Sequence, residues 1–288
     1  MKILSFGEVL FDVYPDKKFI GGAPMNFAAH FVKQGGEAAM ISALGKDTLG
    51  EDAKKCLLEL CLDTSFVTYP DKETGKCLVT LDENQIPSYN LLSDVAYDYI
   101  SCDGVKGDFD ALYFGTLALR SEYNRKSLCA LLEREKYSEI FVDLNIRPPF
   151  YSKESILFAL ENASIVKISD EEMPTVLSEI GLDMSEDYAA VAKALAARFE
   201  NLKIVIVTLG SKGAFAYDCK AKESFACDAV KVKAVSTVGA GDSFSASFLY
   251  KYLAGEGIEK CLEHAAKVAA FVVSRYEAVP SYSAADFN

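Results

Sequence analysis

Short runs of consecutive hydrophobic residues alternate along the chain with longer segments in which hydrophobic residues recur every three or four positions. The first pattern is typical of strands buried on both faces of a sheet, and the second is typical of amphipathic helices. Together they predict an α/β fold with a mainly parallel sheet, helices on both faces and right-handed crossovers. We expect strands at residues 3–6, 38–42, 111–114, 140–143, 164–168 and 204–208, and helices that include 27–33, 124–135, 152–161, 186–199 and 242–253.

One region interrupts this alternation. Residues 74–92 have the pattern of two strands around a turn at 82–84, with no helix between them, and residues 9–20 are also extended in pattern. We interpret both as a small β-sheet lid inserted from about 9–20 and 74–100, with an ordinary surface hairpin as the alternative. No linker or low-complexity tract divides the chain, so we expect a single domain over residues 1–288.

The composition excludes several classes of function. The chain has 288 residues, of which 50% are hydrophobic and 25% are charged, as in a globular protein, and its formal net charge is −12. So acidic a chain is not expected to bind nucleic acid or anionic membranes. There is neither a signal-peptide pattern nor a long uncharged hydrophobic stretch, and no two of the eight cysteines form a CxxC pair. We therefore expect a cytoplasmic protein with reduced thiols and no membrane contact.

The strongest chemical signal is STVGAGDSF at residues 236–244. A β-like run at 230–235 leads into it, and a helix pattern leads out. Gly239 and Gly241 permit a tight turn, and the N–H groups at a helix N-terminus attract anions. Asp242 would then face the bound anion, although it could instead be only the N-cap of the helix.

A second signal is GGAPMN at residues 21–26, at the start of a predicted helix. Gly22 belongs to a turn that permits close approach, and the Asn26 amide suits a polyol hydroxyl because it both donates and accepts. The alternative is a glycine-rich turn whose asparagine caps the helix.

Three more segments lie where predicted strands end. VTLGSKG at 207–213 enters a glycine turn that could hold a nucleotide or form a plain hairpin. DLNIRPP at 143–149 follows a strand, and ligands usually bind at that end of a doubly wound sheet. KISDEE at 167–172 has the pattern of a capped helix start with acids in its first turn.

Taken together, these segments resemble the ribokinase/PfkB family of carbohydrate kinases over nearly the whole chain. GGAPMN followed by GGEAAMISALGKDTLGED is similar to the N-terminal signature of the family, and STVGAGDSF is similar to its C-terminal signature. FGEVLFDVYP, DLNIRPPFY and VKISDEEM are most like fructokinases and 2-keto-3-deoxygluconate kinases. The resemblance implies a ribokinase-like three-layer α/β/α domain with a small β-sheet lid.

The resemblance also implies transfer of the γ-phosphoryl group of ATP to a sugar hydroxyl. Asp242 would be the catalytic base, and the N–H groups of Gly239, Ala240 and Gly241 would form an anion hole. Mg²⁺ would bridge the ATP phosphates largely through water, near Glu172. The implied nucleotide contacts are Thr208, Gly210, Gly213, Lys167 and Glu172, and the implied sugar contacts are Asp12, Gly22, Asn26, Asn145 and Arg147.

Three residues depart from the family pattern. Ser236 stands where the family often has Asp, and Glu277 precedes Ala278 where many members have Gly-Ala. These two changes predict a weak or absent monovalent-cation site, because a hydroxyl holds such an ion poorly. Ser169 replaces a frequent Asn, as it does in fructokinase-like members.

The choice of substrate depends on charge. A sugar acid needs a cation, preferably a forked arginine, but residues 7–16 and 77–105 contain no Lys or Arg. We therefore favour fructose, converted to fructose 6-phosphate, while Arg120 and Arg147 keep a keto-deoxy acid open. A non-catalytic sugar or nucleotide sensor is the alternative of another class, and such a binder would not need Asp242 after an intact glycine turn.

The lid also predicts an assembly. Its strands around Val79 and Tyr89 alternate in polarity and are expected to be exposed, and an exposed strand edge tends to pair with another chain. We expect a homodimer joined through the lids.

Overall fold

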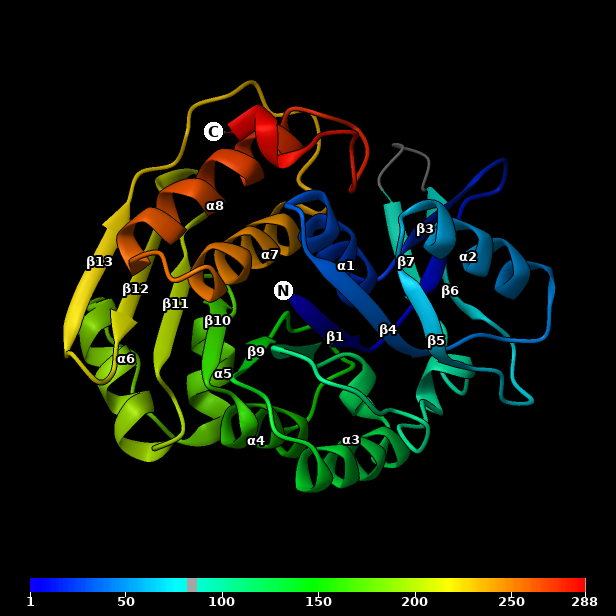
Figure 1. The fold of residues 1–288 in the computed structure, drawn as a ribbon, viewed down its shortest axis with the longest axis horizontal. Helices are drawn as coiled ribbons and strands as arrows, with labels where there is room; N and C mark the ends of the chain where they lie inside the picture. The colour runs from blue at the N-terminus through cyan, green and yellow to red at the C-terminus, as the bar shows by residue number, and fades with distance from the viewer. Residues whose placement is uncertain (82–86, 288) are drawn as a thin grey trace.

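The structure, a computed structural model, describes residues 1–81 and 87–287. A nine-stranded sheet forms its centre (Figure 1). Seven strands pair in parallel, and the last two pair antiparallel at one edge. In sheet order they are β13 (Glu223–Cys227), β12 (Ala214–Asp218), β11 (Ile204–Thr208), β10 (Ile165–Ser169), β9 (Glu139–Asp143), β8 (Ala111–Gly115), β1 (Lys2–Phe6), β4 (Glu37–Ala43) and β5 (Asp63–Thr68). All six predicted strands are confirmed.

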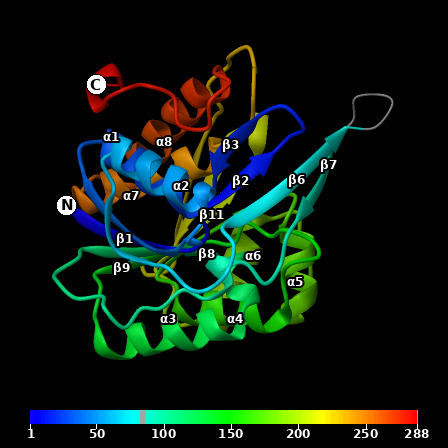
Figure 2. The same cartoon turned by 90° about the vertical axis from the view of Figure 1, so that its right-hand side faces the viewer.

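Helices cover both faces of the large sheet, as the hydrophobic pattern predicted (Figure 2). Each layer of helices buries its apolar face in a separate core against the sheet. One layer consists of α1 (Ala23–Lys33), α2 (Thr48–Glu59), α7 (Ala240–Leu253) and α8 (Ile258–Val273), and the other consists of α3 (Glu122–Arg134), α4 (Lys153–Asn162), α5 (Met173–Ile180) and α6 (Tyr188–Arg198). Four short 3-10 helices complete the described elements: η1 (Ala96–Asp98), η2 (Ala118–Arg120), η3 (Gly210–Lys212) and η4 (Ala284–Phe287).

The predicted lid is a four-stranded sheet in the order β3-β2-β6-β7. Its strands are β2 (Leu10–Val13), β3 (Lys18–Gly21), β6 (Gly75–Leu81) and β7 (Pro87–Leu91), and β6 and β7 project beyond the helical layers (Figure 2). The turn predicted at 82–84 lies outside the described residues. The part of the lid predicted after residue 91 belongs to the main domain instead, because η1 is buried in its core.

Two expectations about exposure and strand structure are wrong. Val79 is buried, whereas its neighbour Leu78 is 37% exposed, so the expected exposure is wrong at Val79. The exposure of the Tyr89 side chain lies outside the described part of the structure. The β-like run at 230–235 forms no strand, although its valines are β-branched, and only the N–H of Val235 bonds to Val273. A strand needs a partner along its whole length, and propensity alone does not supply one. A homodimer through the lids stays a prediction.

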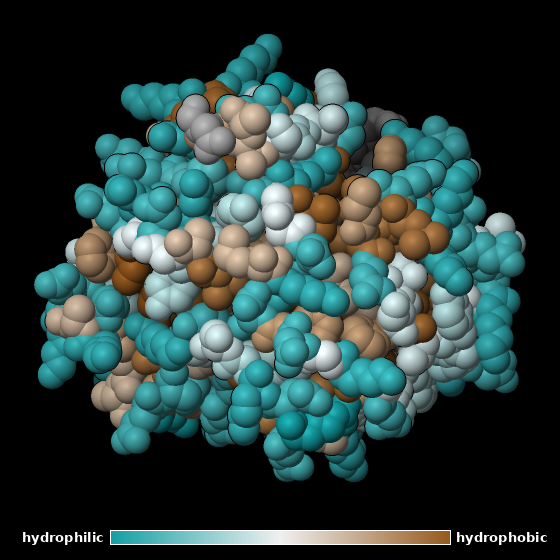
Figure 3. Space-filling model, in the orientation of Figure 1, coloured by the Kyte–Doolittle hydropathy of each residue, from teal (hydrophilic) through white to brown (hydrophobic). Residues whose placement is uncertain are grey.

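In the view of Figure 3, hydrophilic residues cover most of the visible face, and hydrophobic patches are small and scattered. Within the described residues, none of the helices has the length and hydrophobicity needed to cross a bilayer. All eight cysteines have free thiols in the structure.

Candidate active site

Four elements bring polar residues together at the carboxyl end of the large sheet. β9 ends at Asp143, and β10 carries Lys167 two residues before its last residue. The two residues are direct partners in the parallel register, so their side chains lie on the same face. The helices α1 and α7 begin at this edge with their glycine turns, and they pack against each other. Motifs more than 200 residues apart in sequence therefore meet here.

Lys167 and Asp143 form a buried ion pair. The ammonium lies 2.8 Å from one carboxylate oxygen, and the two side chains are only 6% and 2% exposed. Ser245 of α7 donates to the second oxygen at 3.1 Å. Burial opposes the charged ammonium, but attraction by Asp143 and Glu172 outweighs it and raises the pKa of Lys167. The lysine therefore remains a cation inside the protein.

Asp242 is buried next to this pair. It is the third residue of α7, whose N-cap is Gly239, so the alternative that Asp242 caps the helix is wrong. Its carboxylate accepts a 2.8 Å hydrogen bond from the Asn26 amide. Burial, with a smaller contribution from the charge of Asp143, raises the pKa of Asp242 to about 6. Asn26, Lys167 and Arg147 act in the opposite direction.

Asn26 contacts Asp242 and does not cap α1. The N-cap of that helix is Gly22, and Asn26 lies one turn inside. Gly22 has φ 122°, and a Cβ built there would lie 2.3 Å from the carbonyl oxygen of Glu8. This close approach leaves room only for glycine. The alternative interpretation of this motif, in which Asn26 caps the helix, is wrong because Gly22 occupies the N-cap position.

The turn before α7 packs closely against the backbone near the C-terminal end of the chain. Gly239 has φ 80°, and a Cβ there would lie 2.3 Å from the carbonyl oxygen of Ala278. That carbonyl also accepts a hydrogen bond from Nε2 of His30 at 2.9 Å, so it contacts both the turn and α1. A Cβ built on Gly241 would lie 3.6 Å from the Lys167 ammonium, which brings a cation to the turn. The N–H of Ala240 makes a long bond of 3.3 Å to Thr237.

Glu172 organises the backbone beside this turn. One carboxylate oxygen accepts the N–H of Ile146 at 2.6 Å, and the other accepts the N–H of Ser169 at 2.8 Å. Glu172 therefore joins the loops after β9 and β10. Each oxygen keeps a second lone pair, which a water molecule could use.

The predicted nucleotide loop connects β11 to β12. Thr208 is the last residue of β11, and its carbonyl accepts the N–H of Asp170 at 2.9 Å. The segment forms a hairpin, because β11 and β12 are consecutive strands that pair antiparallel. A Cβ on Gly213 would lie 2.0 Å from the Cys227 carbonyl, whereas the position at Gly210 is open. Gly213 is therefore required for packing, and Gly210 faces free space.

The remaining predicted sugar contacts approach the same edge. Asp12 of β2 lies opposite Cys77 of β6 and accepts a hydrogen bond from its thiol. Asn145 has a left-handed φ of 42° in the loop after β9. Arg147 follows in that loop with an exposed side chain, and its charge acts on Asp12 and Asp242. The lid and this loop thus meet at the site.

Glu8 is a residue of this edge that the sequence reasoning missed. It lies two residues after β1 and is only 4% exposed. The N–H of Ala23 donates to its carboxylate, and burial raises the pKa of Glu8 to about 7. The sequence signal that could have identified Glu8 is its position inside a hydrophobic run, because acidic residues are rarely buried.

Arg120, an open candidate for binding a substrate carboxylate, is already paired. It forms a forked contact with Asp98, at 2.7 Å and 2.9 Å, and donates to the Leu92 carbonyl. Its charge also lies 4.8 Å from the centre of the Tyr97 ring. Asp98 thus neutralises Arg120.

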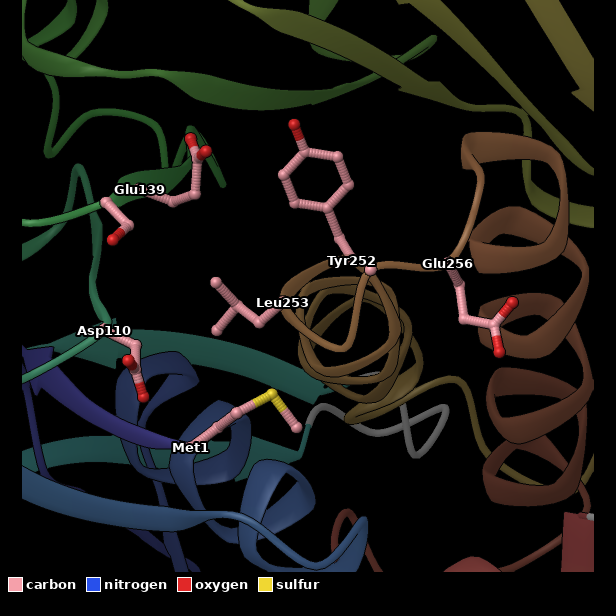
Figure 4. Close-up of a pocket in the computed structure, with 8 residues that line it drawn as sticks. Met1, Asp110, Glu139, Tyr252, Leu253 and Glu256 are labelled. Carbon is pink, nitrogen blue, oxygen red and sulfur yellow. The ribbon is translucent and has the colours of Figure 1, made fainter.

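A separate cavity of about 450 Å³ lies at the opposite end of the sheet (Figure 4). Its walls include Asp110, Glu139 and Tyr252, and Tyr252 stands near the end of α7, whose first turn holds Asp242. It therefore belongs to a different edge from the motif residues.

Comparison with known proteins identifies similar sequences and similar structures over nearly the whole chain. The model of the pfkB family carbohydrate kinase matches residues 2–285. The 5-dehydro-2-deoxygluconokinase of Listeria monocytogenes serotype 4a (strain HCC23) is 28% identical over 286 residues, covering 93% of this chain and 85% of that protein. The fructokinase of Salmonella typhimurium is 28% identical over 264 residues, covering 86% and 83%. A crystal structure of an uncharacterized sugar kinase, PH1459 of Pyrococcus horikoshii, in complex with ATP superposes with a TM-score of 0.83 at 25% identity, covering 99% and 96%.

Proposed function

Because the chain belongs to the pfkB family of carbohydrate kinases, we propose that it transfers the γ-phosphoryl group of ATP to a hydroxyl of a neutral sugar, most specifically fructose, giving fructose 6-phosphate. The observation that carries the proposal is the contact between Asn26 and Asp242 beside the buried Lys167. This contact brings together the GGAPMN and STVGAGDSF motifs. It groups a carboxylate that can act as a base, an amide that orients it and a cation.

In the proposed reaction Asp242 accepts the proton of the attacking sugar hydroxyl. Asn26 fixes the carboxylate through one oxygen and leaves the other free to orient the hydroxyl. Because phosphoryl transfer depends mainly on positioning and charge, an aspartate with a pKa of about 6 is a sufficient base at neutral pH. The charge that develops on the phosphoryl oxygens would be stabilised by the N–H groups of the turn before α7 and by Lys167.

The described residues fit a Mg²⁺ ion held mainly by ATP rather than by the protein. They contain no cluster of three or more His, Cys, Asp or Glu side chains that could hold a metal. Glu172 already accepts two backbone N–H groups, so it would reach the ion through water, using its remaining lone pairs. The ion would neutralise charge on the phosphates.

The charge balance around Asp242 supports a neutral acceptor. Lys167 is paired with Asp143, and Arg120 is paired with Asp98, so neither is a free cation for a substrate carboxylate. Asp12 and Glu8 add two more carboxyl groups near Arg147. A sugar acid would enter a region that is already acidic, where Arg147 is the exposed cation. Arg120 is held by Asp98 through two of its nitrogens, and only its buried Nη1 group has no partner among the described residues.

The test is ATP-dependent ADP release with purified protein over a panel of sugars and sugar acids. We expect fructose to give a kcat/KM well above that of 2-keto-3-deoxygluconate and 5-dehydro-2-deoxygluconate. The Listeria relative makes the latter acid the main competitor. A preference for either acid that Arg147→Gln removes would show that Arg147 supplies a carboxylate site, and the fructose proposal would fail.

ADP release without a phosphorylated sugar would contradict the proposal more broadly. Mass spectrometry of the products separates the two cases. A protein that binds sugar and ATP but turns over neither would be a sensor.

A further inference from the structure

One carboxylate oxygen of Glu8 is buried and has no hydrogen-bond partner among the described residues. Its side chain is 4% exposed, and its carboxylate accepts the N–H of Ala23 and its own N–H. Among the described residues, no side chain or backbone group hydrogen-bonds to Oε2. A buried acceptor without a donor is costly and uncommon in native proteins, so it needs an explanation.

Capping of α1 explains only part of this arrangement. Gly22 is the N-cap and has no side chain to bond the first N–H groups, and its close contact with the Glu8 backbone excludes one. Glu8 supplies the missing cap through its bond from Ala23, the first residue of the helix. One oxygen is enough for that purpose. The second oxygen remains without a role.

The position of Glu8 indicates the role. Ala23 and Asn26 are three residues apart on α1 and therefore lie on one face of its first turn. Ala23 holds Glu8, and Asn26 holds Asp242, so both carboxyl groups are fixed against the same helical turn. Oδ1 of Asn26 is also buried and has no partner in the described part of the chain. Two unused acceptors thus lie beside the catalytic carboxylate.

We propose that Oε2 of Glu8 accepts a hydrogen bond from a second hydroxyl of the acceptor sugar, next to the hydroxyl bound by Oδ1 of Asn26. This inference rests on the proposed function, since it assumes that a sugar is phosphorylated at Asp242. It makes Glu8 a specificity residue that selects polyols with neighbouring hydroxyl groups. A carbonyl or carboxylate at the same place would leave both acceptors unpaired, and a carboxylate would also be repelled.

The test uses Glu8→Gln. The amide can still accept the N–H of Ala23, but it places an NH₂ group where the unused oxygen was. At a pH above the raised pKa of Glu8, where the carboxylate is charged, we expect the KM for the sugar to rise about 10- to 100-fold, as for the loss of one hydrogen bond to a charged group, while kcat and the KM for ATP change little. In the unmodified enzyme, one monodeoxy derivative of that sugar should show the same rise in KM. In Glu8→Gln that derivative should show no additional rise, because the hydroxyl and its acceptor form a single interaction.

The matched control is Glu139→Gln, the same change at a buried acid on the opposite edge of the sheet. It should leave the KM for the sugar unchanged. If Glu8→Gln lowers the melting temperature and reduces kcat on all sugars equally, Glu8 only caps α1 and the assignment is wrong. An unchanged KM with every deoxy derivative would overturn it as well.

Failure of the proposed function gives a different result. The Glu8 comparison uses whichever sugar of the panel the unmodified enzyme prefers, so a preference other than fructose refutes the fructose proposal without deciding the role of Glu8. An unmodified enzyme that phosphorylates none of the panel would refute both.

Discussion

Strand β9 carries a buried carboxylate at each end, and the two acids have the same kinds of partner. Glu139, its first residue, accepts hydrogen bonds from Lys203 at 2.8 Å and Ser164 at 2.5 Å. Asp143, its last residue, accepts from one lysine and one serine as well, Lys167 and Ser245. The chemistry of the two clusters is therefore nearly identical.

Their surroundings differ. The Lys203 side chain is 51% exposed and remains hydrated, whereas the Lys167 side chain is 6% exposed. At the carboxyl end the neighbouring carboxyl group, Asp242, is itself buried, and burial raises its pKa. The difference teaches that an acid, a lysine and a serine can simply close the edge of a sheet. We propose that the same groups at the carboxyl end support catalysis, because burial and an additional carboxylate make their charges depend on one another.

The largest expected effect is a difference in catalytic activity between substitutions at the two ends of β9. Asp242→Asn should lower kcat by roughly 10²- to 10⁴-fold, the range for a positioned acid–base group, and should change the affinities for ATP and sugar little. Glu139→Gln should keep most of the activity, because it lies at the other end of β9. Steady-state kinetics on both variants measures this. An Asp242→Asn enzyme with most of its kcat would remove the proposed base.

The second prediction separates the two lysines by stability. Lys167→Met leaves Asp143 buried without a counter-charge and should lower the free energy of unfolding by about 3–5 kcal/mol. Lys203→Met breaks a pair whose lysine is half exposed and should cost about 0–1 kcal/mol. Urea denaturation of the two variants gives both values. Equal losses would mean that the difference in burial has no energetic consequence.

The third prediction concerns pH. Asp242 must be ionised to accept a proton, and its pKa is raised to about 6, so kcat/KM should be constant at higher pH and fall as pH decreases through about 6. Glu139→Gln should leave this profile in place. A kcat/KM that stays constant well below pH 6 would show that no buried base with a raised pKa controls the reaction.

The smallest expected effect concerns monovalent cations. Lys167 already supplies a positive charge beside Gly241, and Glu277 has an exposed side chain outside the buried cluster. Exchange of K⁺ for tetramethylammonium at constant ionic strength should therefore change kcat by less than about twofold, since no strong charge attracts the ion. A several-fold loss that millimolar K⁺ reverses would show that carbonyl oxygens near Ser236 bind it.

The sequence predicted the architecture and the positions of Asn26 and Asp242 because these features are encoded by short, local patterns. Each hydrophobic run or periodic segment carries its own signal, so the parallel strands and the helices could be recognised one at a time. The glycine turns before α1 and α7 are equally local, and they located Asn26 and Asp242. The misplaced strand at 230–235 shows the limit, because pairing depends on a partner that propensity does not provide.

The rest of the site depends on contacts across the chain. That Lys167 pairs with Asp143 follows from the register of β9 and β10, which no short motif encodes. Glu8 becomes significant only when the folded helix α1 places Ala23 and Asn26 on one face. The sequence left Arg120 as a candidate to bind a substrate carboxylate. Its partner Asp98 is 22 residues away, and no local pattern in either segment predicts that they pair.

The Ala278 carbonyl has a consequence for biosynthesis. It touches the glycine turn at Gly239 and is fixed by His30, whose other ring nitrogen contacts the Tyr282 hydroxyl at 2.7 Å. The turn is therefore not fully supported until the ribosome has made the chain as far as Tyr282, long after the residues of α1 have emerged. A nascent chain would therefore hold the turn before α7 in an unfinished state until these C-terminal residues have been made.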